Sequence, residues 1–329
     1  MLCLALRAQR VPDRLIDDAV ESVTARTPDS LAVRLTSRYS TDREKVRAIF
    51  RWVSGHITYD MDHFDRAARL ARYKASRPDT TYEGRSLNER IAYGVLKRRK
   101  AVCDGYARLF QSLCETAGIR CIMITGYARS EGDHVNTPFV ANHSWNAVYI
   151  DSSWQLLDAT WASGYVVSNT DSFVASFDES YFLTPPSVFI RNHYPEDLEW
   201  TLLTNPPALP EFDQAPYRPA AFLKYRIASY SPGTGVIEAA VGDTVAIRLE
   251  LSDADRSRKV AAGLRPDFLP TVPYESWVNI EPGLIVNPKR LVYRYIVPAK
   301  PASWLNIIYN KDVVLRYRLS IRTRPGVGG

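Results

Sequence analysis

The sequence has little of what metal centres and disulfide frameworks require. Its 329 residues include four cysteines, Cys3, Cys103, Cys114 and Cys121, and no two of them form a C-x-x-C pair. Histidines that bind metals usually stand at paired-ligand spacing or beside cysteines, and the five histidines of this chain show neither pattern. We therefore expect no metal, no cofactor and no disulfide framework. The histidines are His56, His63, His134, His143 and His193.

Long hydrophobic runs are also missing. No apolar stretch approaches the ~20 residues that a membrane-spanning helix needs. Residues 1–10, MLCLALRAQR, have the composition of the end of a signal segment, although a short disordered tail would look similar. The localisation stays open on this pattern, and we favour export to a periplasmic or extracellular space over a cytoplasmic protein.

Nucleic-acid motifs are absent as well, although the formal net charge is +6. The Lys and Arg residues are scattered along the chain. Their densest run, Lys97–Lys100, is typical of a solvated helix end. We expect no nucleic-acid partner.

The first hundred residues are predicted to be helical. Thr41 and Glu44 have capping-box spacing, apolar residues then recur at helical spacing, and Gly55 ends the segment. A further helix is expected from about Leu87 to Lys97.

The periodicity changes after the next predicted helix, 103–117, which Gly118 closes as a C-cap glycine. Three short runs of strand-forming residues come next, IRCIMITGYA, HSWNAVYI and WQLLDATW. Asp151 and Ser152 suit a two-residue hairpin turn between the last two. Helices followed by an antiparallel sheet make an α+β layout.

Proline marks the boundary of this layout. Residues 204–219 are rich in proline and predicted to form a linker. Beyond them, alternating segments separated by Gly, Pro and Asn predict an all-β, immunoglobulin-like sandwich. The predicted parts are thus 1–10 as a leader remnant or tail, 11–203 as an α+β domain, 204–219 as a linker and 220–329 as the sandwich.

Cys103 stands at the predicted start of a helix. A thiolate rather than a thiol attacks a carbonyl, and the free N–H groups and positive dipole end of a helix favour the anion. The same N–H groups can stabilise an oxyanion. The alternative is that Cys103 is a small buried hydrophobic residue like Cys114, and its position alone does not decide between the two.

A base and a carboxylate stand further along, in the predicted sheet. If Asp151 and Ser152 form the turn, Trp145 faces Asp158, and Asp158 shares a face with His143, one diagonal step of roughly 7–8 Å away. A carboxylate can reach an imidazole over that distance and fix its tautomer. A slip of one residue in the turn would move Asp158 to the other face, so the pattern by itself leaves the pairing open.

The stretches around these residues resemble the core of the transglutaminase-like superfamily. They are RKAVCDGYARLFQSLCETAGIRCIMITGYAR and NHSWNAVYIDSSWQLLDATWASG, with IFRWVSGHITYD upstream. The later stretch DESYFLTPPSVFIRNHYPEDLEWTLL resembles the segment after the core in the kyphoscoliosis-peptidase-like branch. The resemblance covers roughly Thr41 to Leu203 and implies that 11–203 is a papain-like catalytic domain.

The resemblance also implies a catalytic triad. Cys103 would be the nucleophile, His143 the general base and acid, and Asp158 the carboxylate that orients the imidazole. The backbone N–H of Cys103 would supply one oxyanion donor.

A second oxyanion donor would be an upstream side chain. Tyr59 is the first candidate, before Trp52 and His56, and each of the three could equally be a packing or surface residue. Trp145 and Trp161 flank the imidazole and the carboxylate, where they would support the site or simply pack.

The implied reaction is acyl transfer on a peptide or glutamine amide bond through a thioester. Water as the acceptor would make the protein a cysteine peptidase or amidase, and a lysine amine would make it a crosslinking transglutaminase. We favour hydrolysis, because nothing in the sequence resembles the calcium sites and additional β-domains of the crosslinking enzymes, or the zinc site of the peptide:N-glycanase branch.

A different class of function is a non-catalytic scaffold that keeps the fold. The expected partners are a protein or peptide substrate and, through the C-terminal β-domain, a partner protein.

Overall fold

A computed structural model describes residues 11–61, 84–129, 140–167, 172–252, 277–280, 284–287 and 290–322. The chain divides into two compact units, the first within residues 1–128 and 140–206 and the second within 129–139 and 207–329. The predicted leader or tail at 1–10 lies outside the described residues, as do His63 and His134. Among the described residues, no helix combines the length and apolar character that crossing a bilayer requires.

Helices lead the first unit, as the sequence predicts. α3 begins with the expected capping box, in which the Thr41 side chain accepts from the Glu44 N–H and the Glu44 carboxylate accepts from the Thr41 N–H. The helices of this unit are α1 (Asp13–Val20), α2 (Pro28–Thr36), α3 (Asp42–His56), α5 (Leu87–Arg98), α6 (Cys103–Thr116), α7 (Ala159–Ser163) and α8 (Pro186–Phe189), with 3₁₀ turns η3 (Glu179–Tyr181) and η4 (Leu198–Thr201).

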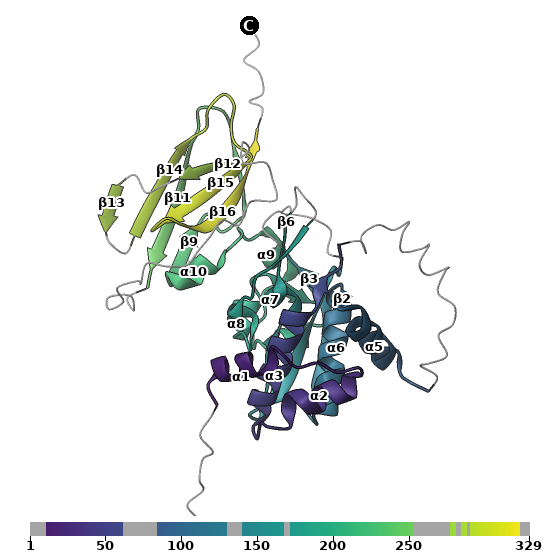
Figure 1. Cartoon of the computed structure of the whole chain (residues 1–329). Coiled ribbons are helices and arrows are strands. Elements are labelled where there is room, and N and C mark those ends of the chain that lie inside the picture. The colour runs from purple at the N-terminus through teal and green to yellow at the C-terminus, as the bar shows by residue number, and fades with distance from the viewer. Residues whose placement is uncertain are drawn as a thin grey trace, which may run out of the picture. The chain divides into compact units, whose positions relative to one another are not determined.

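This unit also contains an antiparallel sheet with the strand order β5-β4-β3-β8. Of its strands, β3 is labelled in Figure 1. Its strands are β3 (Cys121–Ala128), β4 (His143–Ile150), β5 (Ser153–Leu157) and β8 (His193–Pro195). Two small ribbons accompany it: β1 (Thr58–Tyr59) with β2 (Lys100–Ala101), and β6 (Gly164–Val167) with β7 (Ser172–Ala175).

The predicted turn sets the register of β4 against β5. Asp151 and Ser152 have φ of 49° and 62°, and Ile150 pairs with Ser153. Positive φ at both central residues is the requirement of a type I′ hairpin. The run predicted as the last strand is shorter than expected, because β5 ends at Leu157 and Asp158 is the N-cap of α7.

The two faces of this sheet pack against different elements. On one face the side-chain amide of Asn146 donates to the carbonyl of Ala107 in α6, at 3.1 Å. Val148 and Ile150 enter the large helical core on that side. On the other face Trp145 packs in a smaller cluster with α8. The alternation therefore places α6 and the aromatic cluster on opposite sides of β4.

The described residues of the second unit form two four-stranded sheets that share one core. Ile247 and Tyr293 of one sheet and Leu315 and Tyr317 of the other are fully buried in it. The strands are β9 (Ile227–Ser231), β10 (Val236–Ala239), β11 (Thr244–Leu251), β12 (Trp277–Ile280), β13 (Leu284–Asn287), β14 (Arg290–Ile296), β15 (Trp304–Tyr309) and β16 (Asp312–Ile321), in the orders β10-β16-β15-β12 and β13-β14-β11-β9.

The predicted linker is not a plain connection. Residues 204–219 include the helix α9 (Leu209–Gln214), and Tyr217 forms an isolated β-bridge with Arg316 of β16. α10 (Ala220–Lys224) comes directly after it. The prolines that suggested a linker stand partly at the start of α9, where the missing N–H costs no hydrogen bond.

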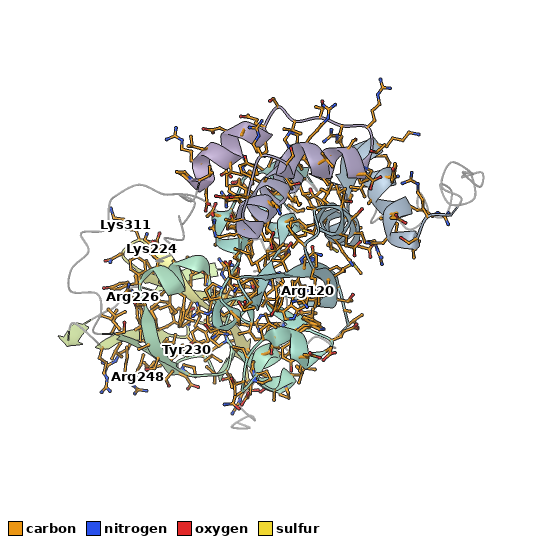
Figure 2. All side chains as sticks on the ribbon, turned by 90° about the horizontal axis from the view of Figure 1, so that it is seen from below. Arg120, Lys224, Arg226, Tyr230, Arg248 and Lys311 are labelled. Atoms are coloured by element: carbon orange, nitrogen blue, oxygen red, sulfur yellow. The ribbon has the colours of Figure 1, made fainter. Side chains whose placement is uncertain are left out.

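Exposed basic side chains account for part of the positive charge of the second unit. Lys224, Arg226, Arg248 and Lys311 are labelled in Figure 2 and are exposed. Lys224 forms an ion pair with Asp312 at 2.6 Å.

A buried cation ties three elements of the first unit together. Arg47 of α3 has a side chain that is only 2% exposed, and it forms ion pairs at 2.6 Å with Asp17 of α1 and with Glu179 of η3. Its guanidinium carbon also lies 4.8 Å from the ring centre of Phe182. The N-terminal helices are thereby connected to the segment after α7.

We expect Arg47→Met to lower the free energy of unfolding of the first unit by about 2–4 kcal/mol. The substitution leaves the carboxylates of Asp17 and Glu179, which are partly solvated, without their cation. Arg43→Met is the matched control. Arg43 forms a single, more exposed pair with Asp13, and its removal should cost less than about 1 kcal/mol. Chemical denaturation followed by tryptophan fluorescence measures both, and equal losses would contradict this role for Arg47.

Candidate active site

Cys103 is the first residue of α6, and its helix start lacks a side-chain cap. The N-cap residue is Val102, whose side chain has no hydrogen-bond acceptor. The half-buried Cys103 thus stands where unpaired N–H groups and the positive end of the helix dipole are concentrated.

Gly105 allows the start of α6 to pack closely on its neighbours. A Cβ at this position would lie 2.7 Å from the Cβ of Ala101 and 2.9 Å from Cγ2 of Val95. Either distance is too short for two carbon atoms in contact. The glycine therefore fixes how near the helix start comes to β2 and α5.

Asp104 is the next residue after the cysteine, and its charge is paired. Arg108, one turn further along α6, donates from Nε to the Asp104 carboxylate at 2.9 Å. The negative charge beside Cys103 is therefore partly balanced within the helix.

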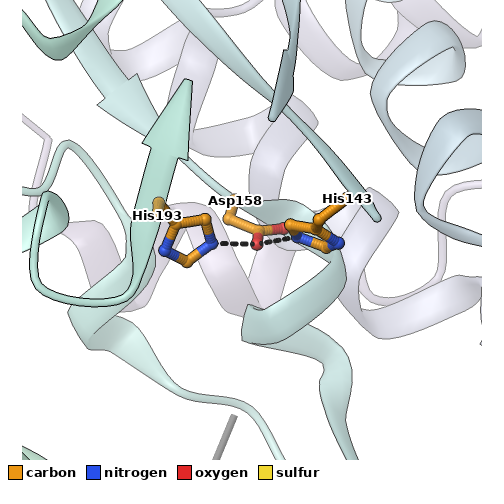
Figure 3. A group of neighbouring side chains, drawn as sticks. All are labelled: His143, Asp158 and His193. Atoms are coloured by element: carbon orange, nitrogen blue, oxygen red, sulfur yellow. Dashed lines mark hydrogen bonds and ion pairs between the residues drawn. The ribbon is translucent and has the colours of Figure 1, made fainter. Parts of the chain in front are cut away.

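His143 and Asp158 are hydrogen-bonded, as the predicted register requires. Nε2 of His143 lies 2.7 Å from Oδ2 of Asp158, and the side chains are 7% and 0% exposed (Figure 3). The other oxygen of Asp158, Oδ1, accepts from the backbone N–H groups of Thr160 and Trp161 at 2.8 and 3.1 Å. The carboxylate that orients His143 is therefore also the N-cap of α7.

The imidazole of His143 lies between Asp158 and Cys103. Burial by itself lowers the pKa of His143, but the Asp158 carboxylate and then a hydrogen bond with the Cys103 thiol outweigh it and raise the pKa to about 10. Burial would raise the pKa of Asp158, but His143 and His193 hold it well below its usual range. Since Nε2 of His143 bonds Asp158, Nδ1 is the nitrogen left for the thiol.

The structure separates the three candidates for a second oxyanion donor. Trp52 is fully buried and its Nε1–H donates to the carbonyl of Val23 at 2.8 Å. Both ring nitrogens of His56 contact backbone carbonyls, each at 2.9 Å. Tyr59 is the candidate near the thiol: burial raises its pKa, and the negative charges of Cys103 and Asp158 add to the shift.

Trp145 and Trp161 both lie against His143. Their ring centroids are 6.0 and 5.6 Å from that of the imidazole. Trp145 is 1% exposed and its indole N–H is buried without a hydrogen-bond partner. Both indoles therefore pack directly against the imidazole.

The sequence did not single out His193, which the structure brings onto Asp158. Nε2 of His193 lies 3.0 Å from Oδ2 of Asp158, on the side opposite His143 (Figure 3). His193 stands in β8, far along the chain, and reaches the site because β8 pairs with β3. No local spacing indicates a contact made by strand pairing.

His143, Asp158 and His193 also form a group whose atoms are close enough to hold a metal ion, the one such group in the part of the chain that the structure describes. The nitrogen–oxygen distances of 2.7 and 3.0 Å are those of direct hydrogen bonds. The geometry therefore fits a carboxylate shared by two imidazoles.

Comparison with known proteins identifies the family to which this chain belongs. Residues 29–159 match the transglutaminase-like superfamily. Kyphoscoliosis peptidase of Mus musculus is 33% identical over 230 residues, which are 69% of this chain and 32% of that protein. The chain belongs to the transglutaminase-like superfamily. Its fold is mixed α+β, with a transglutaminase core and further C-terminal β-sheets.

The superfamily relatives are longer than this chain. Hillarin of Drosophila melanogaster is 32% identical over 225 residues, which are 64% of this chain and 25% of that protein. The chain thus spans about a third or less of the curated relatives that it matches. A solved structure described as a TGase covers 55% of this chain and 40% of its own at 22% identity, with a TM-score of 0.27, which is too low to support a statement about fold.

The raised pKa of His143 predicts that Asp158→Asn lowers the free energy of unfolding by an amount that depends on pH. A histidine whose folded pKa is about 10 contributes stability that is complete below its unfolded pKa of about 6.5 and is lost as the pH rises toward 10. The substitution would remove the negative charge that raises this pKa. The difference in unfolding free energy between wild type and variant should therefore shrink from pH 6.5 to 10, as measured by denaturation at each pH.

Asp151→Asn is the control for this series. Asp151 is exposed in the β4–β5 turn at φ 49°, a conformation that asparagine also tolerates. The free energy of unfolding of the Asp151→Asn variant should equal that of the wild type at every pH. A difference between wild type and Asp158→Asn that stays constant across the range would show that His143 does not owe its charge to Asp158.

Proposed function

We propose that the protein is a cysteine amidohydrolase in which Cys103, His143 and Asp158 form the catalytic triad. One observation carries the proposal: Nε2 of a single buried imidazole hydrogen-bonds a buried carboxylate, and the thiol at an uncapped helix start is the other side chain that raises the pKa of the same imidazole. That arrangement is the one a thiolate–imidazolium nucleophile needs.

The first half-reaction forms a thioester. The Cys103 sulfur attacks the carbonyl carbon of a peptide or glutamine amide, and the carbonyl oxygen takes the electron pair. When that pair returns, the C–N bond breaks, and the protonated His143 gives its Nδ1 proton to the departing nitrogen. Asp158 holds the ring so that Nδ1 faces the sulfur throughout.

The second half-reaction releases the acid. A water molecule attacks the thioester carbonyl while neutral His143 accepts its proton at Nδ1. The C–S bond then breaks, and the sulfur leaves as the thiolate beside the protonated imidazole. The site is restored without any external proton donor or redox partner.

The developing oxyanion needs donors near the sulfur. The uncapped N–H of Cys103 supplies one, and the hydroxyl of Tyr59 supplies the other. Tyr59 is suited to this role because it is the described candidate whose pKa responds to the charge on Cys103. Its raised pKa keeps the hydroxyl protonated, as a donor must be.

Water rather than an amine is the proposed acceptor. Kyphoscoliosis peptidase, which shares the core, is named for peptide hydrolysis. An amine acceptor would use the same thioester, so a crosslinking reaction differs only in the second half-reaction. A protein in which the triad is intact but unreactive would instead be a scaffold.

The two C-terminal sheets are proposed to form an immunoglobulin-like sandwich that binds a partner protein. Support comes from the shared core of the two four-stranded sheets and from the antiparallel pairing of β11 with β14 and of β15 with β16.

The thiolate–imidazolium pair can be tested by alkylation. Cys103 should react with iodoacetamide near neutral pH, whereas Cys114 and Cys121, which are 0% and 6% exposed, should stay unmodified in the folded protein. His143→Ala should slow Cys103 by at least about 10-fold, because the thiolate loses its cation. Mass spectrometry of the labelled peptides gives each rate separately.

If Cys103 reacts no faster than an ordinary thiol, and if His143→Ala does not change its rate, the catalytic function is contradicted. The non-catalytic scaffold would then be the remaining function. Cys103→Ala serves the complementary test, since an enzyme loses turnover with it and a scaffold keeps its binding.

Tyr59→Phe should lower turnover of blocked peptide and glutamine amides by about 10²-fold while leaving Cys103 alkylation unchanged, because the oxyanion forms only with substrate. Tyr93→Phe is the control, since Tyr93 donates to Asp29 at 3.1 Å on the surface. Adding hydroxylamine to the assay separates the acceptors: an excess of hydroxamate over free acid would show that the protein prefers transfer to amines.

A further inference from the structure

We propose that His193 is a positioning residue of this site, which holds the Asp158 carboxylate from the side opposite His143. The inference rests on the proposed function of Cys103, His143 and Asp158. A histidine outside the triad would thus fix the orientation of the Asp158 carboxylate relative to His143.

Four donors surround the two oxygens of Asp158. Oδ1 accepts two backbone N–H groups of α7, and Oδ2 lies 2.7 Å from Nε2 of His143 and 3.0 Å from Nε2 of His193. Asp158 is 0% exposed, so each oxygen depends on donors from the protein. The carboxylate can rotate only by breaking bonds on both oxygens, so His193 completes its restraint.

The two imidazoles come from β4 and β8, the strands that flank β3 on either side. His143 of β4 pairs with Gly126, and His193 of β8 pairs with Ala128 two residues further along the same strand. A Cβ at Gly126 would lie 2.5 Å from the Trp145 ring, so the glycine leaves this face open to the aromatic side chains. The ring centroids of His143 and His193 are 5.4 Å apart.

Aromatic rings fix the orientation of His193. Its imidazole is stacked on Phe189 at 4.2 Å and meets the edges of Trp161 at 4.6 Å and Trp145 at 5.0 Å. The other ring nitrogen, Nδ1, lies 2.7 Å from the Oδ1 position of the Asn192 amide. When Nε2 carries the ring proton, Nδ1 is an acceptor, so the Asn192 amide must be turned to place its N–H₂ group there as the donor. His193 is 1% exposed, and Nε2 therefore has one possible partner on its own side, the carboxylate.

The two imidazoles on Asp158 differ in charge. Burial lowers the pKa of His193 to about 4, and the positive His143 acts in the same direction against the pull of Asp158. His193 is thus neutral near pH 7, and its single ring proton must be on Nε2 to reach Asp158. It restrains the carboxylate without adding a second cation that would compete with His143 for the same charge.

A purely structural role makes a different prediction. If His193 only fills the aromatic cluster, a phenylalanine of similar shape should replace it and a glutamine should not. If it acts by donating to Asp158, His193→Gln keeps an uncharged N–H donor and should work, whereas His193→Phe keeps the ring and should fail. The two variants therefore reverse their order between the two roles.

The experiment measures Cys103 alkylation by iodoacetamide and amide turnover in the full chain for wild type, His193→Gln and His193→Phe. We expect His193→Phe to slow alkylation and turnover by about 10–100-fold, as the loss of one charge-assisted hydrogen bond predicts. His193→Gln should keep most of the wild-type rate. A phenylalanine variant as reactive as wild type, or more reactive than the glutamine variant, would overturn the proposal.

A second measurement needs no variant to be active. ¹⁵N NMR of ring nitrogens in the histidine-labelled full chain at pH 7 should show His193 neutral and protonated on Nε2, with His143 protonated on both nitrogens. The His193 signals are identified by their loss in either variant, or by proximity to the Phe189 and Trp161 rings. A neutral His193 with its proton on Nδ1 would contradict the proposal, because Nε2 would then have no hydrogen to donate to Asp158.

These results separate the two proposals. If wild-type Cys103 ignores His143→Ala, the proposed function fails, and the NMR tautomer still decides whether His193 donates to Asp158. If Cys103 depends on His143 but His193→Phe reacts like wild type, the triad stands and the positioning role of His193 is wrong.

Discussion

The buried carboxylate of Asp158 is the constraint on which the rest of the site depends. A carboxylate with no exposure is costly unless its charge is matched and its lone pairs are filled. Here a helix start, a charged imidazole and a neutral imidazole together meet that requirement. These partners belong to α7, β4 and β8, so the correct placement of three separate elements is needed to satisfy one side chain.

Local physical rules predicted the features of the first unit that depend on residues close together in the chain. The capping pair at Thr41 and Glu44, the helix beginning at Cys103 and the turn at Asp151 and Ser152 each depend on neighbours a few residues away. The turn fixed the register, and the register placed Asp158 on the face of His143. Such features can be predicted because the residues that determine them lie within one helical turn or one hairpin.

Features set by distant packing could not be predicted in this way. His193 joins the site only because β8 pairs with β3, and no periodicity encodes that pairing. Asp158 was expected to end a strand, but its side chain satisfies two N–H groups and begins α7 instead. The prolines of 204–219 suggested a linker, whereas tertiary contacts fold α9 there. The β8–β3 pairing and the hydrogen bonds from Arg129 to the carbonyls of Phe212 and Asp213 in α9 lie outside any local window. At Asp158, by contrast, local N-cap hydrogen bonds to residues two and three positions further along competed with the strand geometry.

The double use of Asp158 couples the site to the secondary structure around it. The carboxylate that orients His143 through Oδ2 also accepts the N–H groups of Thr160 and Trp161 at Oδ1, so fraying of the start of α7 removes two of the bonds that fix this carboxylate. Amide hydrogen exchange at these two positions thus reports on the integrity of the dyad in the resting protein, without substrate and without a chemical label.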